Sequence, residues 1–212
     1  MALLLLLAGV SVLAPSLTNQ PVFAPPAPAG VKRPAYEAAT LWCLEAQRTA
    51  RLRRAGHAAN GSPRHWGQSE DLTDEYYGSL GSIVFHQHSL ARGVTMELAP
   101  LYLPNDQLQN LPQWDARVGA VTIEIKAIPP DTRREDGSLV HRTRLLVKKA
   151  ENHYSDYYVA VRFESPTRYW FAGYAALAEV LAAPIFDKFA PAHALPLSQL
   201  HDLSGATWLR SS

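Results

Sequence analysis

Three residues close together in the chain have the side chains that metal-assisted hydrolysis needs. Glu124 and Lys126 alternate with apolar residues in the run VTIEIKAI, and Asp115 lies nine positions before Glu124. Two carboxylates that converge can hold a hard divalent cation such as Mg²⁺. A lysine beside them can orient a water molecule or stabilise charge that develops on a phosphate. The alternative is an ordinary solvated strand face, on which Glu and Lys form a weak surface ion pair.

The stretch 118–128 must position Glu124 and Lys126, and its composition predicts a β-strand. It is short, apolar and rich in β-branched residues. Successive side chains of a strand point to opposite faces, so the Glu and the Lys share one face. We expect the strand to be interior to its sheet and its odd-numbered face to be buried: Val121, Ile123, Ile125 and Ala127.

Length and composition predict one globular domain with appendages. The chain has 212 residues, of which 47% are hydrophobic and 18% charged, which excludes a disordered protein. An acidic middle segment lies between basic segments, a distribution that suits a metal site beside a phosphate-binding surface if it survives folding. The single cysteine, Cys43, excludes an intramolecular disulfide and falls in an apolar helical stripe, so we expect a buried thiol.

The first 34 residues are expected to form an appendage. Residues 1–14 read MALLLLLAGVSVLA, which has the apolar length of a signal-peptide core but no preceding cation. Three interpretations stay open: a poor secretory signal, an apolar tail that packs on another surface, or an extension from a misplaced start codon. Residues 15–34 are rich in proline and predict an extended linker. Because the basic region of a secretory signal is missing, we expect a cytoplasmic protein without stable membrane association.

The remaining segment, 35–212, alternates helical and strand patterns and predicts a single α/β domain. We expect a mixed sheet of four or five strands with helices on both faces. The helices are expected at 35–55, 69–91 and 175–182, and the strands at 118–128, 144–149, 157–163 and 168–174, with short strand character at 96–103.

Two features of the predicted helices bear on function. Gly78 and Gly81 lie in the middle of helix 69–91, where each costs about 1 kcal/mol relative to alanine, so we expect a close approach to another backbone there. The last turns of helix 35–55 carry arginines that suit either phosphate contact or the negative end of the helix dipole: Arg48, Arg51, Arg53 and Arg54.

The order of these elements resembles the PD-(D/E)XK nuclease superfamily, with Asp115 and the run 124–126 as its motif residues. Segment 77–81, YGSLG, looks like the Gly-Ala-x-Gly helix of a branch of small proteins common in bacteriophages and mobile elements. Segment 195–200, LPLSQL, looks like the C-terminal signature of that branch. The resemblance covers about residues 36–203 and implies a restriction-endonuclease-like core.

The resemblance implies a nuclease that hydrolyses DNA phosphodiester bonds with Mg²⁺ or Mn²⁺. Asp115 and Glu124 would hold the metal, and Lys126 would position the water or offset transition-state charge. A homodimer stays open. The candidates for contacts with the DNA backbone are Arg144, Lys148 and Lys149.

Ser82 departs from the pattern of this family, in which a glutamate often follows the glycines of the helix. A serine hydroxyl is a poor substitute for a carboxylate on Mg²⁺, and Glu75, two helical turns earlier, is about 10 Å away along the axis. We therefore expect one metal at most. The alternatives are a catalytically degenerate nuclease fold that binds DNA or a protein, and a secreted or envelope protein if the leader is a signal.

Overall fold

The computed structural model describes residues 33–59, 68–102, 112–133, 139–140, 142–149, 154–186 and 191–209. Residues 1–32, which hold most of the predicted leader and linker, lie outside this set, so the interpretations of that segment stay expectations. In the described part of the chain, no helix combines the length and apolar character needed to cross a membrane.

A mixed sheet of six strands forms the centre of the fold, in the order β1-β9-β8-β4-β3-β2. Strands β4 and β8 are parallel, and the other neighbours are antiparallel. The strand that carries Glu124, β4, is interior, as expected. The strands are β1 (Tyr36–Glu37), β2 (Glu97–Leu98), β3 (Ala116–Val118), β4 (Val121–Ile128), β8 (Tyr157–Phe163) and β9 (Arg168–Ala176).

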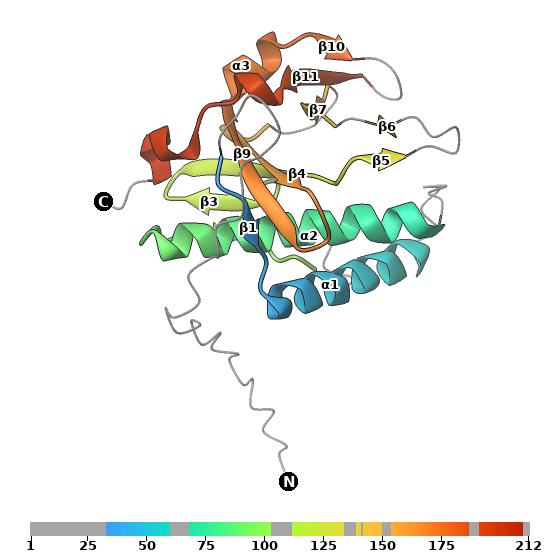
Figure 1. Cartoon of the computed structure of the whole chain (residues 1–212). Helices are drawn as coiled ribbons and strands as arrows, with labels where there is room; N and C mark the ends of the chain where they lie inside the picture. Colours follow the sequence, from blue (N-terminus) through green and yellow to red (C-terminus); the bar gives the residue numbers. More distant parts are fainter. Residues whose placement is uncertain are drawn as a thin grey trace.

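Two long helices, α1 (Thr40–Ala59) and α2 (Gln68–Ala91), lie along one side of this sheet (Figure 1). Of the predicted face of β4, Ile123 and Ile125 are buried there, and Val121 and Ala127 are partly buried against the same core. They pack in one core with β8 and with apolar side chains of α2. Removing this apolar surface from water is the main stabilising contribution to the helix–sheet contact. Cys43 of α1 is buried in the same core, as predicted.

The other face of the main sheet is covered by a second, three-stranded sheet and a short helix. The second sheet has the order β10-β11-β7, with β7 at Arg144–Lys148, β10 at Ile185–Phe186 and β11 at Ala192–Pro196. Helix α3 is Leu177–Ala182, and a two-stranded hairpin consists of β5 (Thr132–Arg133) and β6 (Leu139–Val140). Their core contains Tyr158 and Ala160, so β8 is covered on both faces, as its continuous apolar run predicts.

The α/β class is correct, but the predicted sheet was too small. One of its faces is covered by a second sheet and one short helix, whereas helices alone were expected there. The main sheet gains β1 at one edge and β3 beside β4, while the predicted strand at 144–149 is β7 and belongs to the second sheet instead. β1 lies in the segment predicted as the start of the first helix: Tyr36 pairs with Tyr169, and their rings stack with centroids 5.6 Å apart. This contact between residues distant in sequence overrides the local helical pattern, and α1 begins only at Thr40.

The segments at the two ends of the described chain meet at β9. The guanidinium of Arg33 donates to the carbonyl oxygens of Leu200, at 3.0 Å, and Phe171, at 3.3 Å. Gly173 lies beneath this contact with φ +126°, and a Cβ there would collide with the His201 carbonyl oxygen and with Arg33. Only glycine adopts this backbone conformation without strain and leaves room for both neighbours.

Candidate functional site

The hairpin of β3 and β4 brings the two predicted metal-binding carboxylates together. Asp115 immediately precedes β3, and its N–H donates to the carbonyl oxygen of Ile123 at 3.0 Å. One carboxylate oxygen of Asp115 accepts the N–H of Ile125 at 2.7 Å, so the side chain continues the ladder of the hairpin. Glu124 lies between these two β4 residues. The backbone pairing therefore fixes the position of Asp115 beside Glu124.

A pocket of about 380 Å³ opens at this edge of β4, between the strand and α2. Asp115, Glu124 and Lys126 all line it, so the structure brings the three predicted catalytic residues to one place. Nζ of Lys126 lies 2.9 Å from Glu124 Oε1, and both side chains are about one-quarter exposed. Three further charged residues line the pocket: Arg53, which was a candidate for phosphate contact, and Asp74 and Arg142, which were not predicted as part of the site.

The electrostatics of the pocket act most strongly on Asp115. Burial of the carboxyl group and repulsion by Glu124 together raise the pKa of Asp115 to about 7. The hydrogen bond from the Ile125 N–H and the positive charges of Lys126 and Arg53 act in the opposite direction. Asp115 is therefore about half protonated at neutral pH, and a bound cation would favour its ionised form.

Helix α2 forms the wall opposite β4. Asp74, Gly78 and Ser82 line the pocket from the same helix face, because residues four apart lie one above the other. Ser82 thus faces the same pocket as Asp115 and Glu124, as the resemblance implied. It is 6% exposed, and its hydroxyl donates to the carbonyl oxygen of Gly78 at 3.3 Å.

The two mid-helix glycines have different roles. A Cβ added at Gly81 would lie 3.1 Å from the Cβ of Ala127 in β4, which confirms the predicted close approach of helix and strand. At Gly78 a Cβ would meet nothing within 4 Å, so the prediction was wrong there. Gly81 brings α2 close to the sheet, whereas Gly78 leaves open space in the pocket.

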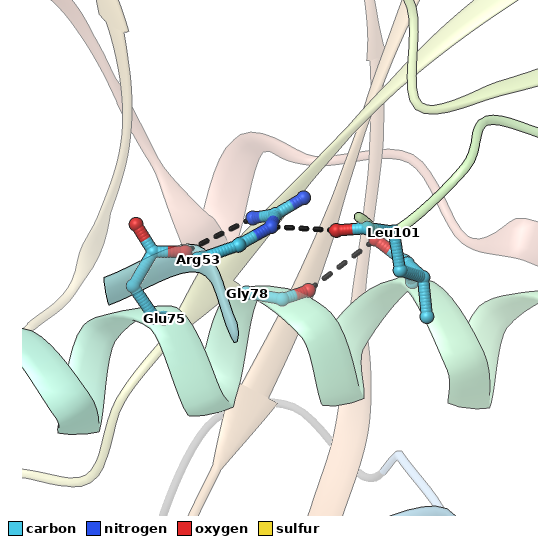
Figure 2. A network of polar contacts seen from close by, with 5 residues as sticks. Arg53, Glu75, Gly78 and Leu101 are labelled. Atoms are coloured by element: carbon cyan, nitrogen blue, oxygen red, sulfur yellow. Dashed lines mark hydrogen bonds and ion pairs between the residues drawn. The ribbon is translucent and has the colours of Figure 1, made fainter. Parts of the chain in front are cut away.

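Arg53 is held at the pocket by a polar network that joins three segments (Figure 2). Its Nε donates to the Leu101 carbonyl oxygen at 2.6 Å, and one terminal nitrogen lies 3.0 Å from Glu75 Oε2. Glu75 is thus engaged with α1 and does not replace the carboxylate missing at Ser82. The helix carboxylate that lines the pocket is the exposed Asp74, eight residues before Ser82. Asp74 lies about two helical turns from Ser82 and hence on the same helix face, and this spacing could have identified it from the sequence.

The predicted DNA-contacting residues lie outside the pocket. Arg144 and Lys148 are exposed at the ends of β7 and Lys149 follows them, also exposed. The guanidinium carbon of Arg144 lies 5.5 Å from the centroid of the Phe186 ring, in the second sheet. Arg142, two residues before Arg144, lines the pocket instead. The contact of these three residues with DNA stays a prediction.

The donor set fits a single hard cation at most. Among the described residues, no group of three or more His, Cys, Asp or Glu side chains could hold a metal ion. Mg²⁺, however, is commonly bound through one or two carboxylates, with water and substrate phosphate as the other ligands. Asp115 and Glu124 provide such a pair.

Comparisons of the chain with protein-family models, with curated proteins and with solved structures each find no match.

Proposed function

We propose that this protein is a Mg²⁺-dependent nuclease that hydrolyses DNA phosphodiester bonds. The observation that carries the proposal is the convergence of Asp115, Glu124 and Lys126 on one pocket at an open edge of an interior strand. The elements come in the order that the PD-(D/E)XK resemblance implies: helix, connector, Asp, and a strand with Glu-x-Lys. Mn²⁺ would serve in place of Mg²⁺, since oxygen ligands suit both ions.

Each residue has a role that follows from its contacts. Asp115, oriented by the Ile125 N–H, and Glu124 would hold the cation. When bound, the cation would lower the pKa of a water molecule and polarise the phosphate. Lys126, which lies against Glu124, would orient the attacking water or offset negative charge in the transition state. The raised pKa of Asp115 supports this assignment, because a cation would favour the ionised carboxylate that burial and Glu124 disfavour.

A second candidate function is binding of DNA or a protein without catalysis. It is favoured by Ser82, which places a hydroxyl where a third carboxylate would complete the site. A site with two carboxylates binds cations weakly, since oxygen-ligand sites lose affinity as charged ligands are removed.

Nicking of supercoiled plasmid separates the two functions. The full chain is incubated with plasmid in millimolar Mg²⁺ or Mn²⁺, beside Asp115→Asn and Lys126→Ala. Nicking by the natural protein that both variants lose, with folding intact, supports the nuclease. DNA binding without nicking in either metal rejects the nuclease in favour of the binding function.

A further inference from the structure

Arg142 approaches the pocket from a segment that is fixed to the main sheet. It lies just before β7, and its backbone N–H donates to Asp131 Oδ1 at 3.0 Å. Asp131 is in turn paired with the guanidinium of Arg162 on β8. The side chain of Arg142 lines the same pocket as Asp115 and Lys126. The backbone of this arginine is thus anchored beside the pocket that the residue lines.

Nε of Arg142 is buried, yet it has no hydrogen-bond partner among the residues that the structure describes. A buried donor without a partner costs about 1–3 kcal/mol, and more when it is charged. Two of the three carboxylates that line the pocket have other partners: Glu124 is paired with Lys126, and Asp115 accepts the Ile125 N–H. The hydrogen-bonding capacity of this guanidinium is therefore incompletely used by the described residues, which suits an anion bound against it.

The pocket has room for such an anion beside Arg142. Gly78 provides open space on α2, and the pocket volume of about 380 Å³ far exceeds the roughly 10–15 Å³ that one water molecule needs by the same measure. The positive charge of Arg142 lowers the pKa of Tyr77 against the larger effect of burial, which raises it. The guanidinium thus lies close enough to this part of α2 to act on a group bound there.

We propose that Arg142 is the residue of this pocket that binds phosphate, and that its ligand is the phosphodiester backbone of a nucleic acid strand. The planar fork of a guanidinium matches two phosphate oxygens, which a lysine ammonium cannot do. The inference rests on the proposed function and adds a positioning residue to it: Arg142 holds the phosphate next to Asp115 and Glu124.

Binding without metal tests this role separately from catalysis. Thymidine 3′,5′-bisphosphate, inorganic phosphate and a fluorescent DNA duplex are titrated into the full chain in EDTA, the duplex over a range of salt concentrations. The variants are Arg142→Gln, Arg142→Lys and Arg48→Gln. Arg48 is the matched control, because its side chain is 73% exposed on α1 and pairs with Glu45.

We expect Arg142→Gln to weaken binding of the bisphosphate about tenfold, which corresponds to about 1.4 kcal/mol. The slope of duplex affinity against salt should fall by about one. Arg142→Lys should be intermediate because it keeps the charge but loses the fork, and Arg48→Gln should bind like the natural protein. The melting temperature of Arg142→Gln should not fall, because the substitution removes a buried donor that has no partner.

Equal affinity of the natural protein and Arg142→Gln for the bisphosphate would overturn the inference, whether or not plasmid is nicked. Inorganic phosphate that binds as tightly as the bisphosphate would overturn the nucleic acid part of it. Loss of bisphosphate binding in Arg142→Gln, combined with no plasmid nicking by the natural protein, would support the phosphate site while rejecting the hydrolytic function.

Discussion

At the scale of single residues, Asp115 determines how the pocket responds to pH. Its folded-state pKa of about 7 lies well above the ordinary value of 3.8. Between these two values the folded protein binds a proton that the unfolded chain has released. The contribution of this group to stability is therefore fully present below about pH 4 and is lost as the pH rises towards 7.

The first prediction concerns Asp115→Asn. An amide keeps an oxygen for the Ile125 N–H and removes the repulsion by Glu124. The variant should therefore not lose the stability that the natural protein loses as the pH rises from about 4 towards 7. Between pH 4.5 and pH 8 in EDTA, the free energy of unfolding relative to the natural protein should rise by about 1–3 kcal/mol, since one pKa unit is worth about 1.4 kcal/mol. Urea denaturation measures it, with Glu124→Gln as a matched variant. A difference that does not change with pH would contradict the assignment.

The second prediction concerns Ser82. Ser82→Glu adds a carboxylate that faces Asp115 and Glu124 across the pocket, so Mg²⁺ affinity should increase about tenfold. Lys126→Ala should abolish cleavage with little loss of metal binding, because the ammonium is not a ligand. Calorimetric titration with Mg²⁺ or Mn²⁺ measures both effects. Ser198→Glu, at an exposed position outside the pocket lining, controls for added charge. Unchanged affinity in a folded Ser82→Glu protein would reject the metal site.

At the scale of elements, the packing of α2 on β4 determines the shape of the pocket. Gly81 brings the helix close to Ala127, so that Gly78, nearly one turn earlier, can line the pocket instead of filling it. The strand cannot move away easily, because β4 is interior and pairs with β8 from Ile123 to Ile128.

The third prediction compares alanine at these two glycines. Gly78→Ala should stabilise the fold by about 0.5–1 kcal/mol, because alanine is the better helix former and its Cβ meets nothing. Gly81→Ala has the same helical gain but forces its Cβ against Ala127, and overpacking costs about 1–3 kcal/mol. Thermal unfolding of both variants measures the difference. If Gly81→Ala is as stable as Gly78→Ala, the helix does not lie against the strand as described.

At the scale of the whole molecule, periodicity in the sequence predicts the helices and strands that form from local patterns, but not the pairing of distant segments. The strand pattern of 118–128 identified the buried residues Ile123 and Ile125 of β4, and the helical pattern of 69–91 predicted α2 to within one residue at its start. The strand β1 and the second sheet were missed, because β1 pairs with β9 and β11 pairs with β7, and both partners are distant in the sequence. Likewise, Asp115 and Glu124 could be found from a local motif. Arg142 could not, because only the tertiary fold brings the segment before β7 to the pocket.

The contact of Arg33 with the carbonyl oxygen of Leu200 joins residues 167 positions apart. Closing so long a loop costs chain entropy before the contact can form, which places it late in folding. A contact absent from the folding transition state affects the rate at which the native state opens, and hardly affects the rate at which it forms. Arg33→Ala should therefore unfold several-fold faster in stopped-flow measurements while refolding at the natural rate. An equal slowing of refolding would instead place this contact in the folding nucleus.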